Sequence, residues 1–453
     1  MNAPTPLSAS PTPPPIASDA EVTAPAPSPE AWSLARRVAF RFAFAYLVLY
    51  SAPFPLDILP GLSDLATSLN DGLWQAVVPW VGKHVLRLST DITVFPNGSG
   101  DTTFNYVQLL LFFAVAVTVT GVWSILDRRR AEYVKAHDVL NTLVRYVLAM
   151  AMLSYGLAKL SKSQFPFPGP DRLVQPLGDL SPMGLLWNFM GFSKGYNIFT
   201  GGAEFLGGCL LLFRRTTTLG AIVTAGVMVN VVALNFFYDV PVKIYSSHLL
   251  LMALFLMLPD ARRLLDVLLL NRATQPRPLQ PPFPPSRWLT GAGVVMKLLV
   301  VGGIAYGFAG SRLDYIRKYG DDAPRPPLYG YYTVESFTLD GQPLDAASGD
   351  ARRWKVMFVN RFGRLAIKHL DDSVKSFGLE DDATKKALTL IEGAGEAAKK
   401  SVLTYARPEA NQLVLQGTLQ DATLEVRLTR VDESGFLLLN RGFHWIQEYP
   451  FNR

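Results

Sequence analysis

Residues 104–126 have the sequence FNYVQLLLFFAVAVTVTGVWSIL, a run of 23 residues without a charged side chain. A second uncharged run of 23 residues covers positions 216–238. About 20 apolar residues in a helix cross the hydrocarbon layer of a membrane, so each run predicts a span. Of the 453 residues in the chain, 49% are hydrophobic and 18% are charged, where a soluble domain carries about 25% charge. With a mean hydropathy of +0.19, this composition excludes a purely soluble protein.

The hydrophobic pattern predicts an α-helical membrane bundle of about seven transmembrane helices. We place them at residues 34–52, 104–126, 139–161, 196–213, 216–237, 244–258 and 289–310. If the N-terminus is cytoplasmic, the inner loops hold thirteen Lys and Arg residues and the outer loops hold six. The positive-inside rule therefore predicts a cytoplasmic N-terminus and, after an odd number of spans, an extracytoplasmic C-terminus. We expect a protein integral to a bacterial inner membrane.

Composition also divides the chain into regions. Residues 1–30 contain nine prolines and predict a disordered tail. Residues 31–138 hold the first two spans with an outer interfacial segment, and residues 139–271 hold a four-helix core. A proline-rich linker at 272–288 and the last span at 289–311 follow, and residues 325–453 form a separate C-terminal domain.

The C-terminal domain has the pattern of an antiparallel β structure. Short runs rich in β-branched and aromatic residues alternate with turn signals such as Asp340-Gly341 and Gln420-Asp421. They predict a small β-barrel or sandwich outside the cytoplasm. Within it, residues 385–400 are predicted to be helical, and residues 440–452 are predicted to form a closing strand.

Ionisable residues inside spans are the first functional candidates, because a charge in the bilayer is costly. Glu204 lies midway along the fourth span, with Gly201 and Gly208 on the same helix face, so another helix can approach closely. Lys159 lies near the outer end of the third span, one turn beyond Tyr155. A Lys159–Glu204 pair would neutralise two charges that neither residue could hold alone in lipid.

Further polar residues are predicted at a similar depth in the outer half of the bundle. These are Asn230, Asn235, Asp239, Lys243 and His248. Together with the Lys–Glu pair they predict a polar pocket beneath the β domain that binds a polar headgroup or transfers protons. The structural alternative is an ion pair with asparagines that bond across helices.

Two groups of residues lie outside this predicted pocket. Arg145 is interpreted as a residue whose guanidinium reaches the inner face of the membrane. Near the C-terminus, Arg441, His444 and Glu448 line the mouth of a ligand site in one interpretation and face solvent from a closing strand in the other.

Several chemistries are not predicted. The single cysteine, Cys209, excludes an intrachain disulfide, and the five histidines have no metal-ligand spacing. No phosphate-binding glycine loop or nucleophile motif occurs. The net charge of +6 is explained by basic residues at helix ends, so we expect a lipid bilayer rather than nucleic acid as partner.

Three short motifs together resemble the DoxX-like family of small four-helix membrane proteins. They are the stretches Gly156-Leu157-Ala158-Lys159-Leu160, Glu204-Phe205-Leu206-Gly207-Gly208, and Arg214-Arg215 followed by Leu219-Gly220-Ala221. The resemblance covers about residues 139–270, under a third of the chain. It implies association with membrane redox complexes, including quinone-linked sulfur oxidation, and it makes Lys159 and Glu204 the family-type polar positions. The extra spans, the tail and the outer β domain depart from the family.

The sequence leaves three functions open. The first is a subunit of a quinone-linked redox complex, in which Tyr155, Lys159, Glu204 and His248 supply protons at the quinone carbonyls. The second is a non-enzymatic scaffold that binds lipid or a partner. The third is an acid–base enzyme with Lys159 or Lys243 as base, because membrane helices followed by an outer β domain are similar to vitamin K-dependent carboxylases. That similarity is one of architecture.

Overall fold

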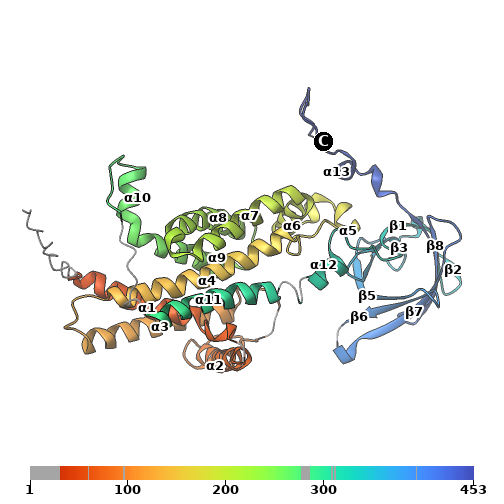
Figure 1. Ribbon diagram of the computed structural model, residues 1–453. Coiled ribbons are helices and arrows are strands. Elements are labelled where there is room, and N and C mark those ends of the chain that lie inside the picture. The colour runs from red at the N-terminus through yellow and green to blue at the C-terminus, as the bar shows by residue number, and fades with distance from the viewer. Residues whose placement is uncertain are drawn as a thin grey trace, which may run out of the picture.

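The computed structural model describes residues 31–59, 61–94, 97–276, 286–307, 310, 313–393 and 395–452. The predicted tail at 1–30 and the centre of the predicted linker, 277–285, lie outside the described residues. A bundle of helices is followed by a β-barrel, which lies beyond one end of the bundle (Figure 1). This arrangement confirms the predicted combination of an apolar helical region with a C-terminal antiparallel β domain.

The helical part begins with α1 and ends with α12. Its helices are α1 (Leu34–Ser51), α2 (Ser63–His84), α3 (Thr103–Leu126), α4 (Val134–Leu160), α5 (Pro170–Leu173), α6 (Pro182–Phe192), α7 (Lys194–Leu211), α8 (Thr217–Phe237), α9 (Lys243–Met257), α10 (Ala261–Leu268), α11 (Arg287–Gly307) and α12 (Leu313–Tyr319). Two 3₁₀ turns connect helices of the bundle: η3 (Arg214–Thr216) joins α7 to α8, and η4 (Leu258–Asp260) joins α9 to α10.

Among the described residues, five helical segments are long and apolar enough to cross a membrane. They are Leu34–Ile58, Thr103–Leu126, Val134–Leu160, Arg214–Phe237 and Lys243–Leu268. The predicted spans at 196–213 and 289–310 form α7 and α11, which are not among these five, although α11 contains a shorter apolar stretch. The total of seven spans and their orientation therefore stay predictions.

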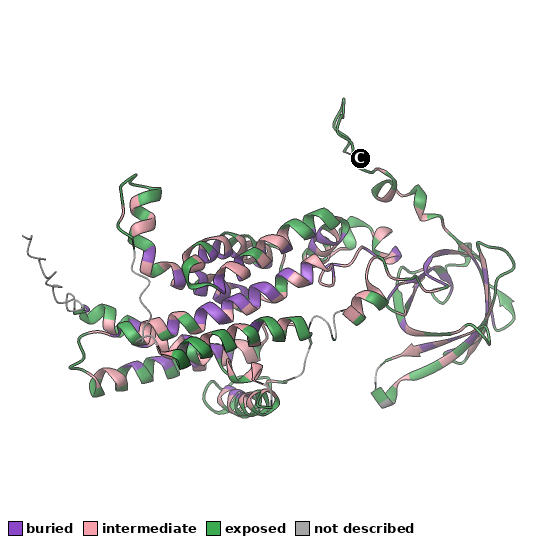
Figure 2. Cartoon of the chain, in the orientation of Figure 1, coloured by how far each residue is buried: buried purple, intermediate pink, exposed green. Residues whose placement is uncertain are grey.

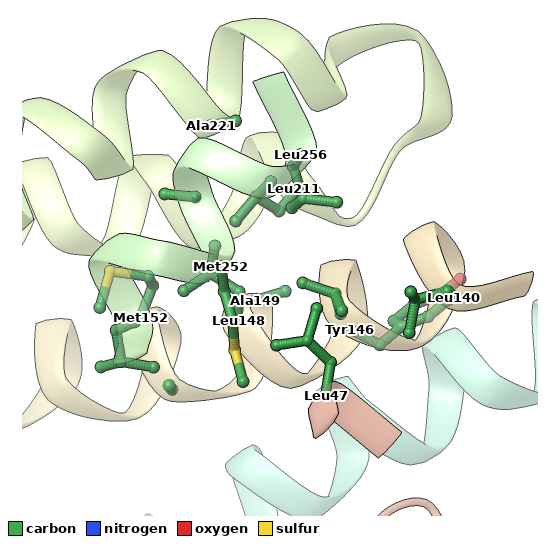
Figure 3. Packing of buried hydrophobic residues seen from close by; sticks show 14 of the residues in the cluster. Leu47, Leu140, Tyr146, Leu148, Ala149, Met152, Leu211, Ala221, Met252 and Leu256 are labelled. Carbon is green, nitrogen blue, oxygen red and sulfur yellow. The ribbon is translucent and has the colours of Figure 1, made fainter. Parts of the chain in front are cut away.

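Helix α4 is the central helix of the bundle. It is the most buried of the five apolar segments, whereas α3 leaves most of its apolar side chains exposed, as a lipid-facing helix does (Figure 2). Around α4 pack α1, α7, α9 and α11, and the shared core includes Leu47, Leu148, Met152, Leu211 and Met252 (Figure 3). Burial of these side chains on one continuous surface holds the bundle together.

The close packing of α4 against α7 depends on glycine. A Cβ atom added to Gly201 of α7 would lie 2.7 Å from the Cβ of Lys159 and 2.9 Å from the carbonyl oxygen of Gly156, both in α4. A Cβ on Gly156 would lie 2.7 Å from the backbone nitrogen of Phe205. The two backbones therefore approach each other more closely than any larger residue at these positions allows.

The C-terminal domain is a closed barrel. Its strands are β1 (Gly330–Leu339), β2 (Gln342–Pro343), β3 (Trp354–Val359), β4 (Arg364–His369), β5 (Val374–Asp382), β6 (Ala387–Glu392), β7 (Lys399–Ala406), β8 (Gln412–Leu419) and β9 (Ala422–Arg430). All pairings are antiparallel, and β1 also pairs with β9, which closes eight strands into a barrel with the short β2 attached to β1. Of the predicted alternatives, barrel and sandwich, the structure shows the barrel. Met357, Leu365 and Val426 are among the side chains that fill its interior.

Two predictions for this domain are wrong. The predicted helix at 385–400 forms β6 and β7 instead, because Leu388 and Leu390 alternate inward along β6 with the period of a strand. The predicted closing strand at 440–452 does not form: a short helix, α13 (Leu437–Asn440), precedes it, and the described residues 441–452 contain no strand. Since β1 and β9 already pair, the barrel leaves no edge for another closing strand.

The barrel is connected to the bundle at the end where α4 terminates, which we call the barrel end. Asp321, just after α12, accepts hydrogen bonds from the backbone nitrogen of Phe167 and from Arg361 of the barrel, both at 2.8 Å. The ammonium of Lys162, two residues beyond α4, lies 2.6 Å from the same carboxylate. Helix α5 also contacts β1 and β3. One aspartate thus ties the end of α4, the segment 161–169 and the barrel together.

Candidate functional site

A buried ion pair joins α4 to α7. The Nζ atom of Lys159 lies 2.6 Å from Oε1 and 2.7 Å from Oε2 of Glu204. Lys159 is 6% exposed and Glu204 is 2% exposed. Because the ammonium contacts both carboxylate oxygens, each residue neutralises the other in a place where neither charge would be stable alone. The predicted Lys159–Glu204 pair is therefore present.

The local sequence explains how this pair forms. Gly201 lies one turn before Glu204 and contacts the backbone of α4 beside Lys159, so the two side chains start from neighbouring turns of closely packed helices. The ring of Tyr155, one turn before Lys159, has its centroid 5.9 Å from the Lys159 ammonium. At that distance the face of the ring adds a favourable cation–π contact.

A cavity of about 90 Å³ lies beside the ion pair. Its walls come from α4, α6, α7, α8, α9 and the segment 161–169, and both Lys159 and Glu204 line it. The wall is mainly apolar: it combines four aromatic residues, three methionines and six Leu or Val residues, and its aromatic members are Tyr155, Phe165, Trp187 and Tyr245. The cavity therefore combines an apolar interior with one fixed ammonium–carboxylate pair.

Two polar atoms at the cavity have no protein partner. They are Oε1 of Gln164, an acceptor, and Nδ2 of Asn235, a donor, and both atoms are buried. Buried polar atoms in proteins are nearly always hydrogen-bonded, so such atoms mark places where a ligand or ordered water completes the network. The site thus offers one donor and one acceptor in addition to the ion pair.

The structure brings together four of the predicted site residues, Tyr155, Lys159, Glu204 and Asn235. His248 is not among the residues that line the cavity. Its Nε2 lies 2.7 Å from the hydroxyl of Tyr46, its Nδ1 lies 2.7 Å from the carbonyl oxygen of Ile244, and its ring stacks on Tyr50 at 4.0 Å. Nε2 and the ring face thus pack α9 against α1, while Nδ1 is bound to the preceding turn of α9 itself.

Three other predicted residues also lie away from the cavity. Asn230 is exposed on α8, and Asp239 pairs with Lys243 at 2.9 Å in the turn between α8 and α9. Asp101 accepts hydrogen bonds from the first backbone nitrogens of α9 and lies 3.9 Å from the Lys243 ammonium. For Asn230 the reason is its direction on α8: it lies five positions before Asn235, which turns the helix by about 140°.

The C-terminal candidates form no site with the bundle. Arg441 donates a hydrogen bond to Gln447 at 3.1 Å and lies over the ring of Phe451, and His444 and Glu448 are exposed. They belong to the segment that extends from the barrel after α13 (Figure 1).

Sequence reasoning missed Gln164, Trp187 and Tyr245 of the cavity wall. The spacing of Trp187 and Met190 on one face of α6 was visible in the sequence, but nothing in the sequence placed that face over α4 and α8. Gln164 lies just after a predicted span, and no sequence pattern around it predicts a place in a binding site. Among the residues that the structure describes, no group of three His, Cys, Asp or Glu side chains has the arrangement of a metal site.

Comparison with known proteins identifies one relative. No family model and no solved structure matches the chain. The Bacillus subtilis (strain 168) protein named "Uncharacterized protein YwoB" is 34% identical over 123 residues, which are 78% of that protein and 27% of this chain. The chain belongs to the YwoB family. The similarity to YwoB concerns about a quarter of the chain, and YwoB, an uncharacterized protein, brings no activity with it.

Proposed function

We propose that the chain is a DoxX-like membrane subunit of a quinone-linked redox complex, and that the cavity beside Lys159 and Glu204 receives the quinone ring. The observation that carries this proposal is the combination, in one cavity, of aromatic walls with a buried ammonium–carboxylate pair. A quinone ring needs apolar surroundings for its faces and hydrogen-bond donors at its carbonyl oxygens.

The residues present fit such a ring. The Lys159 ammonium and the Tyr155 hydroxyl are donors at the cavity, and the unpartnered Nδ2 of Asn235 is a third. The volume of about 90 Å³ is below the roughly 150 Å³ that holds benzene in an engineered protein cavity. Met152, Met190 and Met228 line the wall, however, and flexible methionine side chains can repack to widen it.

Reduction of a quinone consumes two electrons and two protons. In this proposal the partner proteins of the redox complex supply the electrons. Lys159 would donate one proton to one carbonyl oxygen and the Tyr155 hydroxyl the second proton to the other, and both groups would take protons back from water at the barrel end; Glu204 stabilises the Lys159 ammonium before the transfer and after reprotonation. The chain's own role is to bind the ring, orient it and hold these protons in a place sheltered from water.

The proposed topology has the N-terminus in the cytoplasm of a bacterium and the barrel outside the inner membrane. Supporting it, the arginine-rich turns at Arg214–Arg215 and Arg262–Arg263 lie at the end of the bundle opposite the barrel (Figure 1). Basic residues accumulate on the cytoplasmic side of membrane proteins.

A non-enzymatic scaffold is the second candidate. It is favoured by the fact that Lys159 and Glu204 satisfy each other and lie where α4 and α7 pack most closely, so the pair also has a structural role. The carboxylase-like alternative is supported less well, because Lys159 is bound to Glu204 and Lys243 to Asp239, which leaves neither lysine free to act as a base.

The deciding experiment measures quinone binding by the full-length protein in mild detergent. Trp187 lines the cavity, so a short-chain ubiquinone should quench tryptophan fluorescence in a saturable manner, and Trp187→Phe should remove that component. We expect Lys159→Met and Glu204→Gln to weaken binding by about tenfold or more, since each removes a charged hydrogen-bonding group.

Lys243→Met is the matched control, because Lys243 lies at the same end of the bundle but outside the cavity. It should bind quinone as the wild type does. Folded wild-type protein without saturable binding would leave the scaffold as the better function. Equal losses in the Lys243 and Lys159 variants would exclude the cavity as the binding place.

A further inference from the structure

A second cavity lies at the end of the bundle opposite the barrel. It has a volume of about 310 Å³ and is bounded by α4, η3, α8, η4 and α10. Its charged lining consists of the four arginines Arg145, Arg214, Arg215 and Arg263 and the two aspartates Asp138 and Asp260. Four positive and two negative side chains give the lining a formal charge of +2.

The aspartates are already engaged. Asp260 accepts hydrogen bonds from Arg263 at 2.8 Å and from the hydroxyl of Thr218 at 2.5 Å. Asp138 lies 4.0 Å from Arg214, the limit of an ion pair. Neither carboxylate is paired with Arg145 among the described residues.

Arg145 is the unusual member of the cluster. It lies on the central helix α4 and is only 8% exposed, yet no carboxylate pairs with it among the described residues. Its Nε atom is buried without a hydrogen-bond partner, and its guanidinium lies 4.9 Å from the ring of Tyr146. A buried charge without a counter-ion is costly, and a bound anion removes that cost.

With Leu160 at one boundary of the hydrocarbon layer, the position of Arg145 along α4 puts its guanidinium within reach of the lipid headgroups at the other boundary. Arg145 lies 15 residues before the end of α4 at Leu160, which is about 22 Å along the helix axis. In a hydrocarbon layer of about 30 Å, this leaves about 8 Å to the opposite boundary. Long arginine side chains at such a depth reach the phosphate region.

We propose that this cavity binds the phosphate group of an anionic phospholipid, with Arg145 as the buried half of the site and Arg214 and Arg215 at its rim. The planar guanidinium of arginine matches two phosphate oxygens at once. Basic pockets at helix ends recognise anionic headgroups in this way. The buried Oδ1 of Asn141 has no partner and lines the same cavity, so it can accept a hydrogen bond from a headgroup hydroxyl. Soluble phosphate offers the same oxygens to the guanidinium groups, and the experiment below distinguishes it from a lipid headgroup.

The test uses the full-length protein in detergent and counts bound lipids by native mass spectrometry. Phosphatidylglycerol and phosphatidylcholine with the same acyl chains are compared, with inorganic phosphate as competitor. We expect the wild type to prefer phosphatidylglycerol, Arg145→Met to bind it about tenfold or more weakly, and Arg145→Lys, which keeps the charge but not the planar fork, to lie between them.

Arg262→Met is the control, because Arg262 is next to Arg263 but 94% exposed and outside the cavity. It should retain the preference. If Arg145→Met does not fold, Arg214→Gln, on the half-exposed rim, gives the same comparison. Displacement by millimolar phosphate without a preference among lipids identifies soluble phosphate as the ligand of the same site. Equal binding of both lipids with no effect of phosphate, or an equal loss in Arg262→Met, overturns the proposal.

Discussion

Lys159 and Glu204 depend on each other for their place in the bundle. Moving both charges out of water costs free energy, and their contact at 2.6 Å and 2.7 Å offsets much of that cost. Removal of one partner leaves the other charge buried and unpaired. Removing one partner is therefore expected to lower the free energy of unfolding far more than replacing both residues by apolar ones.

We expect Glu204→Gln to lower the free energy of unfolding by about 3–5 kcal/mol, because it leaves the Lys159 ammonium without a counter-charge. The double variant Lys159→Met with Glu204→Leu should lie much closer to the wild type, since it buries no charge. Reversible unfolding of the purified protein in denaturing detergent measures both. A double variant at least as unstable as Glu204→Gln would show that the pair does not act as a unit.

Single residues also show what depth alone can predict. The cost of a charge in lipid identified Lys159 and Glu204 from sequence, and both line the cavity. The same argument selected Asp239, Lys243 and His248, which do not line it. Depth follows from counting residues along a span, whereas the direction of a side chain depends on which neighbouring helix packs on which face. The partner helices were not defined by the sequence.

Among the described residues, helices α4 and α7 make the most extensive contact between elements of the bundle. Gly156 and Gly201 lie against each other's backbones, and Gly208, two turns after Gly201 on α7, faces Leu153 and Ala149. This row of small residues sets the separation of the two helices, and through it the distance between Lys159 and Glu204. The neighbouring Gly202 has open space at the position of a Cβ atom.

Gly201→Ala should therefore destabilise the protein by about 1–3 kcal/mol, because a Cβ would lie 2.7 Å from the Cβ of Lys159 and the helices must separate. Gly202→Ala is the adjacent control. It should leave stability unchanged or raise it by up to about 1 kcal/mol, since alanine favours a helix over glycine. Thermal unfolding of both variants provides the comparison, and equal losses would argue against close packing at Gly201.

Elements with a long, uniform pattern were predicted better than elements whose type depends on their neighbours. The uncharged run at 104–126 matches α3 almost to the residue, because an uninterrupted run of about 20 apolar residues rarely forms any structure other than a helix. The stretch at 385–400 became two strands because β5 and β8 offered edges on both sides, which no local pattern reveals. Closure of the barrel by β1 and β9 then left the C-terminal segment without a strand partner.

The bundle and the barrel are two separate cores, joined by the polar contacts of Asp321, by α5 against β1 and β3, and by the rings of Tyr319 and Phe362. The apolar cluster around α4 and the cluster inside the barrel share no residue. Between them, Asp321 binds Lys162, Arg361 and the backbone of Phe167. The relative placement of the two parts thus depends on very few side chains.

Asp321→Asn should loosen the barrel from the bundle without unfolding either part, because it removes the charge that both Lys162 and Arg361 contact. Hydrogen exchange should become faster in α12 and in residues 161–169, and stay unchanged in β3–β8. Asp322→Asn is the control, since Asp322 is 90% exposed and has only a 3.5 Å contact with Lys194. Unchanged exchange in the Asp321 variant would mean that other contacts hold the barrel.

The segment that follows α4 contacts both the barrel end and the cavity within a few residues. Lys162 is fastened to Asp321 beside the barrel, while Gln164 and Phe165 form part of the cavity wall. Only three positions of backbone separate Lys162 from Phe165, so we expect a tilt of the barrel about Asp321 to shift part of the cavity wall beside Lys159.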